Sequence, residues 1–181
     1  MDALSPIRTE YHRYRRLVEQ ALEQVADPDL DRRPDADGNS IAILLGHLAG
    51  NLRSRFTDFL TSDGEKPWRR RDAEFEPSGK DRAALLADWH AAWVILERAL
   101  DEVAAAGPAG LERTIAIRRQ PLTVHEALLR SVAHVAYHAG QVVQLARTFA
   151  GPRWRSLSIP RGGSAAYLAN PTKEQDPDGA R

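Results

Sequence analysis

The sequence predicts an all-α protein: a four-helix bundle with long crossover loops and a short extended or hairpin segment before the last helix. Four segments of the 181-residue chain carry apolar residues at the three- and four-residue spacing of a helix that is buried along one side. Hydrophobic residues make up 43% of the chain and charged residues 28%, which is typical of a globular domain with a sizeable core. We therefore expect one bundle over residues 1–169 and a disordered tail over the polar residues 170–181.

The first two predicted helices flank a connector that is rich in turn-forming residues. The first helix begins near Ser5-Pro6, because proline is tolerated in the first turn of a helix. The connector covers residues 27–38 and consists largely of Asp, Arg, Pro and Gly. The second helix opens at Asn39-Ser40 and extends to about Leu60, with His47 at the edge of its apolar stripe.

The third predicted helix follows a long charged loop, residues 61–77. It covers residues 81–106, and Ser78 is its expected N-cap. Trp89 and Trp93 belong to its apolar stripe, so this helix is expected to contribute much of the core.

The last predicted helix is the longest, residues 124–149. Thr123 and Glu126 have the spacing of a capping box, in which a hydroxyl and a carboxylate each accept a backbone N–H at the helix start. Gly151-Pro152 ends the helix. Residues 114–123, just before it, predict a small hairpin or an extended connector.

Two histidines of the last helix are the first candidates for a functional site. His134 and His138 are four residues apart, so they lie one turn apart on the same side of the helix. That side also carries Ala127 and Leu145 and is expected to face the bundle interior. Two explanations stay open: both imidazoles are hydrogen-bonded core residues, or they are ligands of a metal ion, since imidazole binds Zn, Ni, Cu and Fe.

A metal ion needs at least a third ligand, which His47 of the second helix can supply. The helix face of His47 also carries Ser40, Asn51, Ser54 and Asp58, a polar strip beside the core. A single histidine at such an edge is otherwise an ordinary half-exposed residue. The chain lacks the H-E-x-x-H pattern, so a zinc protease of that class is not indicated.

Further polar residues are candidates for supporting roles around the histidines. Asn51, Asp58 and Gln141 are candidates for orienting the imidazoles through hydrogen bonds. Arginines are candidates for binding an anion such as a carboxylate, namely Arg53, Arg55, Arg69, Arg70, Arg71 and Arg161. For the run at 69–71 the alternative is pairing with the acidic residues that follow it, Asp72, Glu74 and Glu76.

Composition excludes several classes of function. The formal net charge is zero, so we expect no nucleic-acid partner and no anionic membrane partner. No run of 18 apolar residues exists and no signal-peptide pattern is present, so we expect no membrane span and a cytoplasmic location. The chain has no cysteine, which excludes disulfides, thiolate ligands and a cysteine nucleophile. A thiol used in any reaction would have to arrive with a substrate.

Four segments together carry a resemblance to a known family. They lie within residues 40–60, 63–75, 133–141 and 157–164, and the resemblance covers most of residues 5–168. The chain resembles the DinB/YfiT-like superfamily of four-helix-bundle metalloproteins, and within it a subgroup of unknown function. The resemblance implies a divalent metal ion (Zn, Ni or Fe) that is bound by one histidine of the second helix and two of the last, which are His47, His134 and His138 here. It also implies a homodimer, and members of the superfamily include thiol transferases that use bacillithiol or mycothiol.

These observations lead to three hypotheses of function. The first is a metal-dependent transferase that adds a low-molecular-weight thiol to an electrophilic small molecule. The second is a hydrolase that uses metal-bound hydroxide, and the third is a non-catalytic, stress-related metal-binding protein. The sequence assigns no catalytic residue beyond the metal ligands. Because only neutral imidazole binds a metal, loss of the ion is expected below about pH 6.

Overall fold

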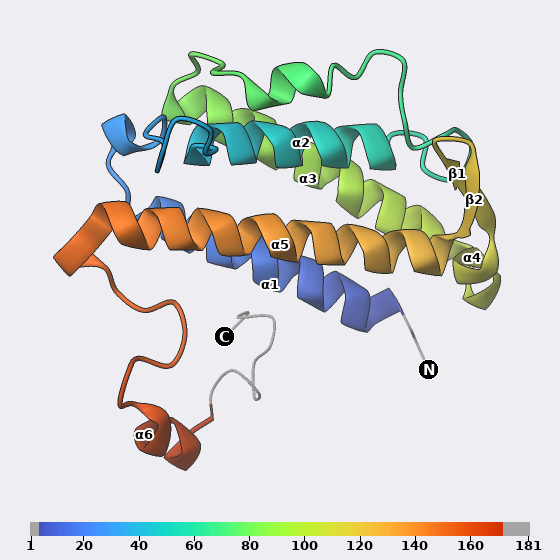
Figure 1. Cartoon of the computed structure of the whole chain (residues 1–181). Coiled ribbons are helices and arrows are strands. Elements are labelled where there is room, and N and C mark those ends of the chain that lie inside the picture. The colour runs from blue at the N-terminus through green and yellow to red at the C-terminus, as the bar shows by residue number, and fades with distance from the viewer. Residues whose placement is uncertain (1–3, 172–181) are drawn as a thin grey trace.

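The protein is a bundle of four long helices, as the sequence predicts. The computed structural model describes residues 4–171. The long helices are α1 (Leu4–Leu22), α2 (Ile41–Phe56), α3 (Arg82–Ala105) and α5 (Val124–Ala150). Helix α1 packs along α5, helix α2 packs along α3, and α5 also contacts α2 (Figure 1).

The connection between α2 and α3 is a crossover loop. Helices α2 and α3 point in the same direction, so the chain must return along the outside of α2 before α3 begins (Figure 1). This loop, residues 57–81, contains a short 3-10 helix at Asp72–Phe75 that packs against α2. The connector between α1 and α2 instead joins neighbouring helix ends and contains a 3-10 helix at Asp27–Asp29. Helix α5 runs in the opposite direction to α2, so these two helices pass each other antiparallel (Figure 1).

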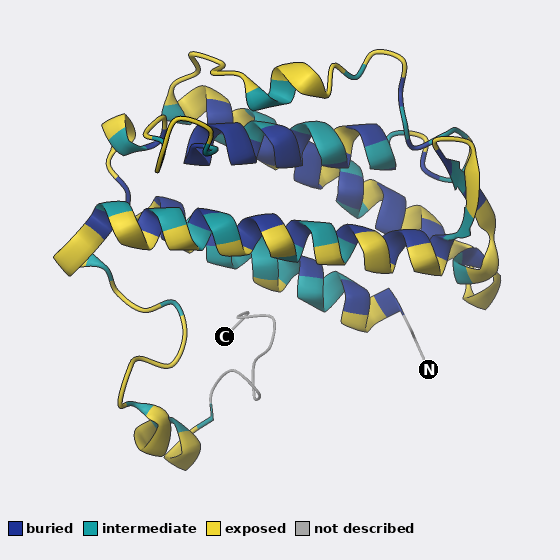
Figure 2. Ribbon diagram, in the orientation of Figure 1, coloured by how far each residue is buried: buried dark blue, intermediate teal, exposed yellow. Residues whose placement is uncertain are grey.

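Aromatic side chains form the centre of the core. Tyr11 of α1 meets the rings of Phe56 and Trp93 edge-on, with ring centroids 6.3 and 6.2 Å apart. Trp89 and Trp93 are completely buried and lie 5.3 Å apart. Figure 2 shows the buried stripes of the four helices turned toward each other and the exposed residues on the outside. Burial of each large apolar side chain stabilises the fold by roughly 1.5–3 kcal/mol.

A small hairpin closes one end of the bundle. A short helix α4 (Pro108–Glu112) leads into strands β1 (Thr114–Ile117) and β2 (Gln120–Thr123), which pair antiparallel. The two turn residues, Arg118 and Arg119, both have positive φ, as the tight turn of a two-residue hairpin requires. Asp63 of the crossover loop accepts hydrogen bonds from both of their backbone N–H groups, at 2.8 and 2.7 Å. The hairpin thereby anchors the crossover loop.

Two helix ends differ from the predicted ones. Helix α2 ends at Phe56, four residues before the predicted Leu60, because Thr57 is extended and Asp58 has a φ of 49°. The N-cap of α3 is Asp81, whose carboxylate accepts the N–H of Ala84, and not the predicted Ser78. Ser78 instead accepts the N–H of Lys80 within the loop.

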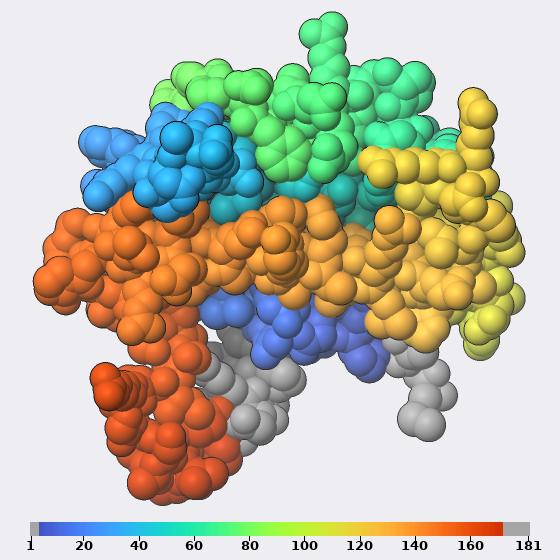
Figure 3. All heavy atoms as spheres, in the orientation of Figure 1, coloured from blue at the N-terminus to red at the C-terminus, as the bar shows by residue number. Residues whose placement is uncertain are grey.

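The C-terminal segment leaves the bundle after α5. A 3-10 helix at Gly151–Arg153 follows α5, and Trp154 and Leu157 pack against the core. The last described helix, α6 (Ser164–Ala169), projects away from the bundle (Figures 1 and 3). From residue 172 on, the predicted disordered tail lies outside the described residues. Within residues 4–171, no helix is both long and apolar enough to cross a membrane.

The capping box at the start of α5 gives the first testable prediction. Thr123 accepts the N–H of Glu126, and Glu126 accepts the N–H of Thr123. The substitution Thr123→Ala should lower the free energy of unfolding by about 1 kcal/mol, because the backbone N–H of Glu126 loses its acceptor and the Glu126 carboxylate loses the hydrogen bond from the Thr123 hydroxyl. Urea unfolding followed by circular dichroism measures this change. Thr148→Ala, near the other end of α5, removes a hydroxyl that caps nothing and should change stability less; equal losses would contradict the role of the capping box.

Candidate metal centre

Three histidines converge between α2 and α5. His47 comes from the middle of α2, and His134 and His138 come from successive turns of α5. One ring nitrogen from each lies within 4.8 Å of the others, and the Nε2 atoms of His47 and His134 are 3.2 Å apart. The arrangement is close to what a metal ion requires, since Zn–N bonds of 2.0–2.1 Å in tetrahedral geometry separate two nitrogens by about 3.3 Å. The three histidines could therefore hold a metal ion.

The local structure explains why these rings meet. The four-residue spacing places His134 and His138 on one side of α5, with ring centroids 4.6 Å apart. Because α2 crosses the same stretch, the ring of His47 lies 5.2 Å from that of His134 and 4.9 Å from that of His138. His47 and His138 are only 3% and 8% exposed, so the cluster lies at the inner face of the bundle.

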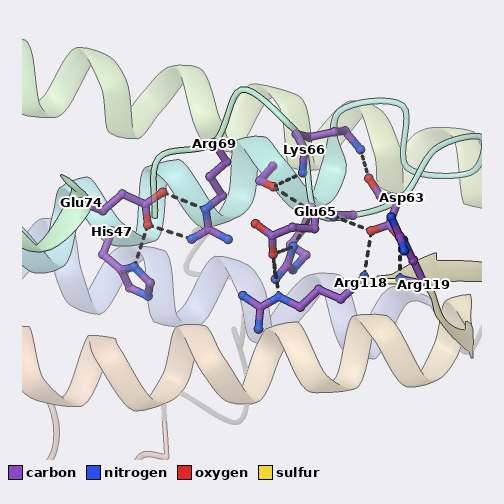
Figure 4. Close-up of polar contacts among 11 residues, drawn as sticks. His47, Asp63, Glu65, Lys66, Arg69, Glu74, Arg118 and Arg119 are labelled. Atoms are coloured by element: carbon purple, nitrogen blue, oxygen red, sulfur yellow. Dashed lines mark hydrogen bonds and ion pairs between the residues drawn. The ribbon is translucent and has the colours of Figure 1, made fainter. Parts of the chain in front are cut away.

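A carboxylate of the crossover loop holds the ring of His47. Glu74 Oε2 lies 2.9 Å from His47 Nδ1, and the same carboxylate accepts two hydrogen bonds of 2.8 Å from Arg69 (Figure 4). A carboxylate can only accept here, so Nδ1–H of His47 donates the hydrogen bond. The lone pair of the ring is then on Nε2, which faces His134. The ring of Phe75 covers His47 at a centroid distance of 4.6 Å.

Gly50 makes this contact possible. It lies one turn after His47 on α2, and the carboxylate of Glu74 packs against its Cα. A Cβ at this position would collide with Glu74 Oε1, whereas a Cβ at Gly46 would meet nothing within 4 Å. Glu74 can therefore reach His47 only because residue 50 has no side chain.

A side chain of α5 itself holds the ring of His138. Gln141 Oε1 lies 2.7 Å from His138 Nδ1 and can only accept, so Nδ1 carries the proton and Nε2 the lone pair. This hydrogen bond is the contact that the predicted orienting role of Gln141 requires.

His134 differs from the other two because its Nδ1 is buried without a hydrogen-bond partner. Burial, together with smaller effects of the neighbouring His138, His47, Arg69 and Arg55, lowers the pKa of His134 from 6.5 to about 3. Burial, opposed by the hydrogen bond to Gln141, also lowers the pKa of His138. Both imidazoles are therefore neutral at pH 7, the form that binds a metal. Neutral rings with two Nε2 lone pairs aimed inward fit a divalent ion.

Glu74 is the residue of the site that the sequence did not reveal. In the sequence it was only a possible partner for the arginines at 69–71, and it does pair with Arg69. Burial would raise the pKa of Glu74, but hydrogen bonds from Arg69 and His47 hold it below its usual value. Glu74 is thus a carboxylate anion with two partners. A general rule could have directed a search for such a residue, because metal-binding histidines commonly donate their second N–H to a carboxylate.

The other two residues predicted to orient the imidazoles form no hydrogen bond with them within residues 4–171. Asn51, one turn after His47, lines a small cavity of about 30 Å³ together with Arg55 and Ser131. Asp58 lies beyond the end of α2, about 16 Å along the helix axis from His47 at 1.5 Å per residue. At this separation the carboxylate of Asp58 cannot reach the imidazole of His47.

The predicted anion-binding arginines have different surroundings. Arg69 binds Glu74, and Arg55 binds Glu65 and the carbonyl oxygen of Gly64. Within the part of the chain that the structure describes, the other four form no hydrogen bond with the imidazoles. Arg53 stacks over Trp68 and lines, with Arg70, a cavity on the outside of α2. Arg71 lies near Asp72 and over Phe75, and Arg161 is exposed in the turn before α6. Only Arg55 and Arg69 are near enough to influence the pKa of His134.

The role of Gly50 can be tested by adding one methyl group. Gly50→Ala should displace Glu74 from His47 and lower the metal affinity by about 10- to 100-fold, the usual effect of losing a carboxylate that orients a histidine ligand. Competition with a chromophoric chelator measures the affinity. Gly46→Ala, one turn earlier on the same helix, has room for its Cβ and should leave the affinity unchanged. Equal losses in both variants would show that the Glu74 contact is irrelevant.

The pKa of His134 gives a prediction for the metal-free protein. Because this pKa is lowered to about 3, its Cε1–H signal in NMR spectra should not titrate between pH 7 and 4. In the urea-unfolded chain the ring should titrate near 6.5. Between about 6.5 and 3 the unfolded chain binds the extra proton, so stability should fall as pH falls through this window. His134 therefore does not account for a loss of metal at pH 6, which the sequence alone suggests. A folded-state midpoint near 6.5 would contradict the buried environment.

Comparison with known proteins identifies a family but no reaction. The model of a family described as "Protein of unknown function (DUF1572)" matches residues 1–163, a span that includes all three histidines. No curated protein and no solved structure matches the chain. The chain therefore belongs to the DUF1572 family, whose function is not established.

Proposed function

We propose that this protein binds one divalent metal ion through His47, His134 and His138 and transfers a low-molecular-weight thiol to an electrophilic small molecule. The observation that carries the proposal is the convergence of three imidazoles from two helices, with ring nitrogens within 4.8 Å of one another. The resemblance to the DinB/YfiT-like superfamily, which includes thiol transferases, supports the choice of reaction. Zn, Ni and Fe all suit a set of imidazole ligands.

The number of ligands favours a catalytic ion over a structural one. Structural zinc sites have four protein ligands, whereas three protein ligands leave a position for an incoming molecule. A divalent ion in this place supplies Lewis acidity, which lowers the pKa of a thiol or water molecule that binds to it. Glu74 and Gln141 keep the imidazoles of His47 and His138 in one orientation and one tautomer.

The thiol would be a separate molecule, because the chain contains no cysteine. Arg55 and Arg69 place positive charge close enough to His134 to lower its pKa. Positive charge beside the cluster favours the thiolate form of a thiol and attracts a carboxylate on the same molecule. Of the six arginines in the sequence prediction, Arg55 is the proposed contact for the anionic cosubstrate, because the Arg69 side chain is only 2% exposed and already binds Glu74.

The proposed active form is a homodimer, as the resemblance implies. Exposed apolar side chains in the C-terminal segment are compatible with a second subunit. Ile159 is 39% exposed and Leu168 is 77% exposed.

The proposal is tested with cobalt-substituted protein purified without a histidine tag. Adding mycothiol, bacillithiol or glutathione should produce a thiolate-to-cobalt absorption band in the near ultraviolet, because sulfur would enter the coordination of the ion. The variant His134→Ala should bind no cobalt and give no band. His125→Ala, which removes an exposed histidine of the same helix, should behave like the unmodified protein.

Two outcomes would contradict the proposal in different ways. If His134→Ala still binds one equivalent of cobalt with unchanged affinity, the ligand set is wrong. If cobalt binds to the three histidines but no thiol changes its spectrum, thiol transfer is wrong, and hydrolysis by metal-activated water gains support.

A further inference from the structure

A cavity of about 510 Å³ lies beside the histidine cluster. Its walls are the connector between α1 and α2, the start of α2 and the C-terminal half of α5. Figure 3 shows the connector and this half of α5 lying against each other. The volume is within the range of about 300–1,000 Å³ that is usual for small-molecule sites.

The walls of this cavity are apolar or uncharged, with one exception. Leu44, Tyr137 and Leu145 supply apolar surface, and the amides of Gln141 and Gln144 supply hydrogen-bonding groups. Among residues 4–171, Asp37 is the only charged residue that lines the cavity, and no lysine or arginine of this range lines it. A ligand with negative charge would therefore meet repulsion here and no cation to offset it.

Two residues connect the cavity to the histidine cluster. Gln141 lines the cavity and accepts the hydrogen bond from His138 Nδ1 at 2.7 Å. Tyr137 also lines it, and its ring meets the ring of His138 edge-on at 4.9 Å. Tyr137 is 65% exposed, so its ring is accessible to a molecule in the cavity. A molecule in the cavity would thus contact two residues that touch a proposed metal ligand.

The opposite side of the cluster has the opposite electrostatic character. Figure 4 shows Arg69, Glu65 and Arg118 following His47 toward the hairpin end of the bundle. Arg55 and Arg118 both bind Glu65 there, so this side contains more arginines than carboxylates facing them. The groove between α2 and α5 therefore has a cationic end and an uncharged end, with the histidines between them.

We propose that this cavity binds the apolar, uncharged body of the electrophilic substrate. That the bound molecule is a substrate rests on the proposed function, whereas its binding in the cavity does not. The ligand class is a neutral molecule with an aromatic or branched aliphatic group and one amide-like or carbonyl group for Gln141 or Gln144. Carboxylates of the same shape bind poorly in the cavity.

The test uses a pair of probes that share a ring and differ in charge: benzamide and benzoate. Both are titrated into the metal-free, full-length protein, so that benzoate cannot bind through a metal ion. We expect benzamide to cause saturable NMR shifts in the side-chain amides of Gln141 and Gln144 and in the backbone amides of Gly38 and Gly140, which line the cavity. Benzoate should bind at least about fivefold more weakly, because of Asp37.

Two pairs of variants separate the walls of the cavity from general effects. Tyr137→Ala should weaken benzamide binding about five- to tenfold, whereas Leu129→Ala, another half-exposed apolar residue of α5, should not. Asp37→Lys should strengthen benzoate binding by about fivefold, the effect expected of reversing one charge at a solvated wall. Asp31→Lys makes the same charge change in the same connector, outside the cavity wall, and should leave the benzoate-to-benzamide ratio unchanged.

The outcomes decide the inference independently of the metal. Absence of saturable benzamide shifts in these amides, or equal binding of benzoate and benzamide, would overturn it. Equal losses in Tyr137→Ala and Leu129→Ala would show that the shifts arise elsewhere on α5, and would overturn it as well. Because these measurements need no metal, benzamide binding can succeed while the cobalt experiment fails, or the reverse.

Discussion

The antiparallel packing of α2 against α5 is the constraint on which the candidate site depends. No short segment of the chain contains all three histidines; they meet only because these two helices cross at His47. The same stretches bury Leu48 and Val135 completely. Each such side chain stabilises the fold by roughly 1.5–3 kcal/mol, which is comparable to the roughly 1–3 kcal/mol lost when a buried polar group such as His134 Nδ1 has no partner. The apolar core thus keeps the imidazoles close together without requiring them to satisfy one another.

The crossover loop supplies the second constraint, because it carries Glu74 and Arg69 to the site. The loop is fixed at the hairpin end by Asp63, which accepts backbone N–H groups from the hairpin turn, and near its other end by Glu74 on His47. The ion pair between Arg69 and Glu74 is almost completely buried, with the Arg69 side chain only 2% exposed. A buried ion pair contributes little net stability, since desolvation opposes the attraction, but its two hydrogen bonds fix the carboxylate in one orientation. The orientation of the His47 imidazole therefore depends on a loop that must be ordered along most of its length.

The features that could be predicted from the sequence are those that depend on residues close together in the chain. The start of α5 follows from Thr123 and Glu126, and the shared face of His134 and His138 follows from their spacing. The choice of His47 as the third candidate ligand follows from its place at the edge of an apolar stripe, together with the resemblance. The end of α2 could not be predicted, because the apolar stripe continues through Phe59, which is buried even though the helix has already ended.

Glu74 and the cavity beside Tyr137 could not be predicted for a different reason. Both depend on where a connector lies relative to a helix that is distant in the sequence, and no spacing rule relates residue 74 to residue 47. The small residue at position 50 is visible in the sequence, but a glycine in a helix interior does not by itself reveal what approaches it. The predicted role of Asp58 failed because this residue lies about three helical turns beyond His47 along the chain. Residues that orient a ligand from another element are therefore the ones that a single sequence is least able to identify.

The unequal support of the three imidazoles suggests how they divide their roles. His47 and His138 each have Nδ1 bound to an acceptor, which fixes both the ring and the tautomer. His134 has no such acceptor, so its tautomer is set only by what its Nε2 faces. It can donate Nε2–H to the lone pair of His47 across the 3.2 Å separation, or it can carry its proton on Nδ1 and offer Nε2 as a third lone pair. Both forms are neutral, but the first leaves only Nδ1 unsatisfied, whereas the second also loses the hydrogen bond to His47 and is therefore less stable without an ion. An ion bound as proposed would require the proton of His134 on Nδ1, so that a metal–nitrogen bond replaces the hydrogen bond to His47 while the charge of the ring stays zero.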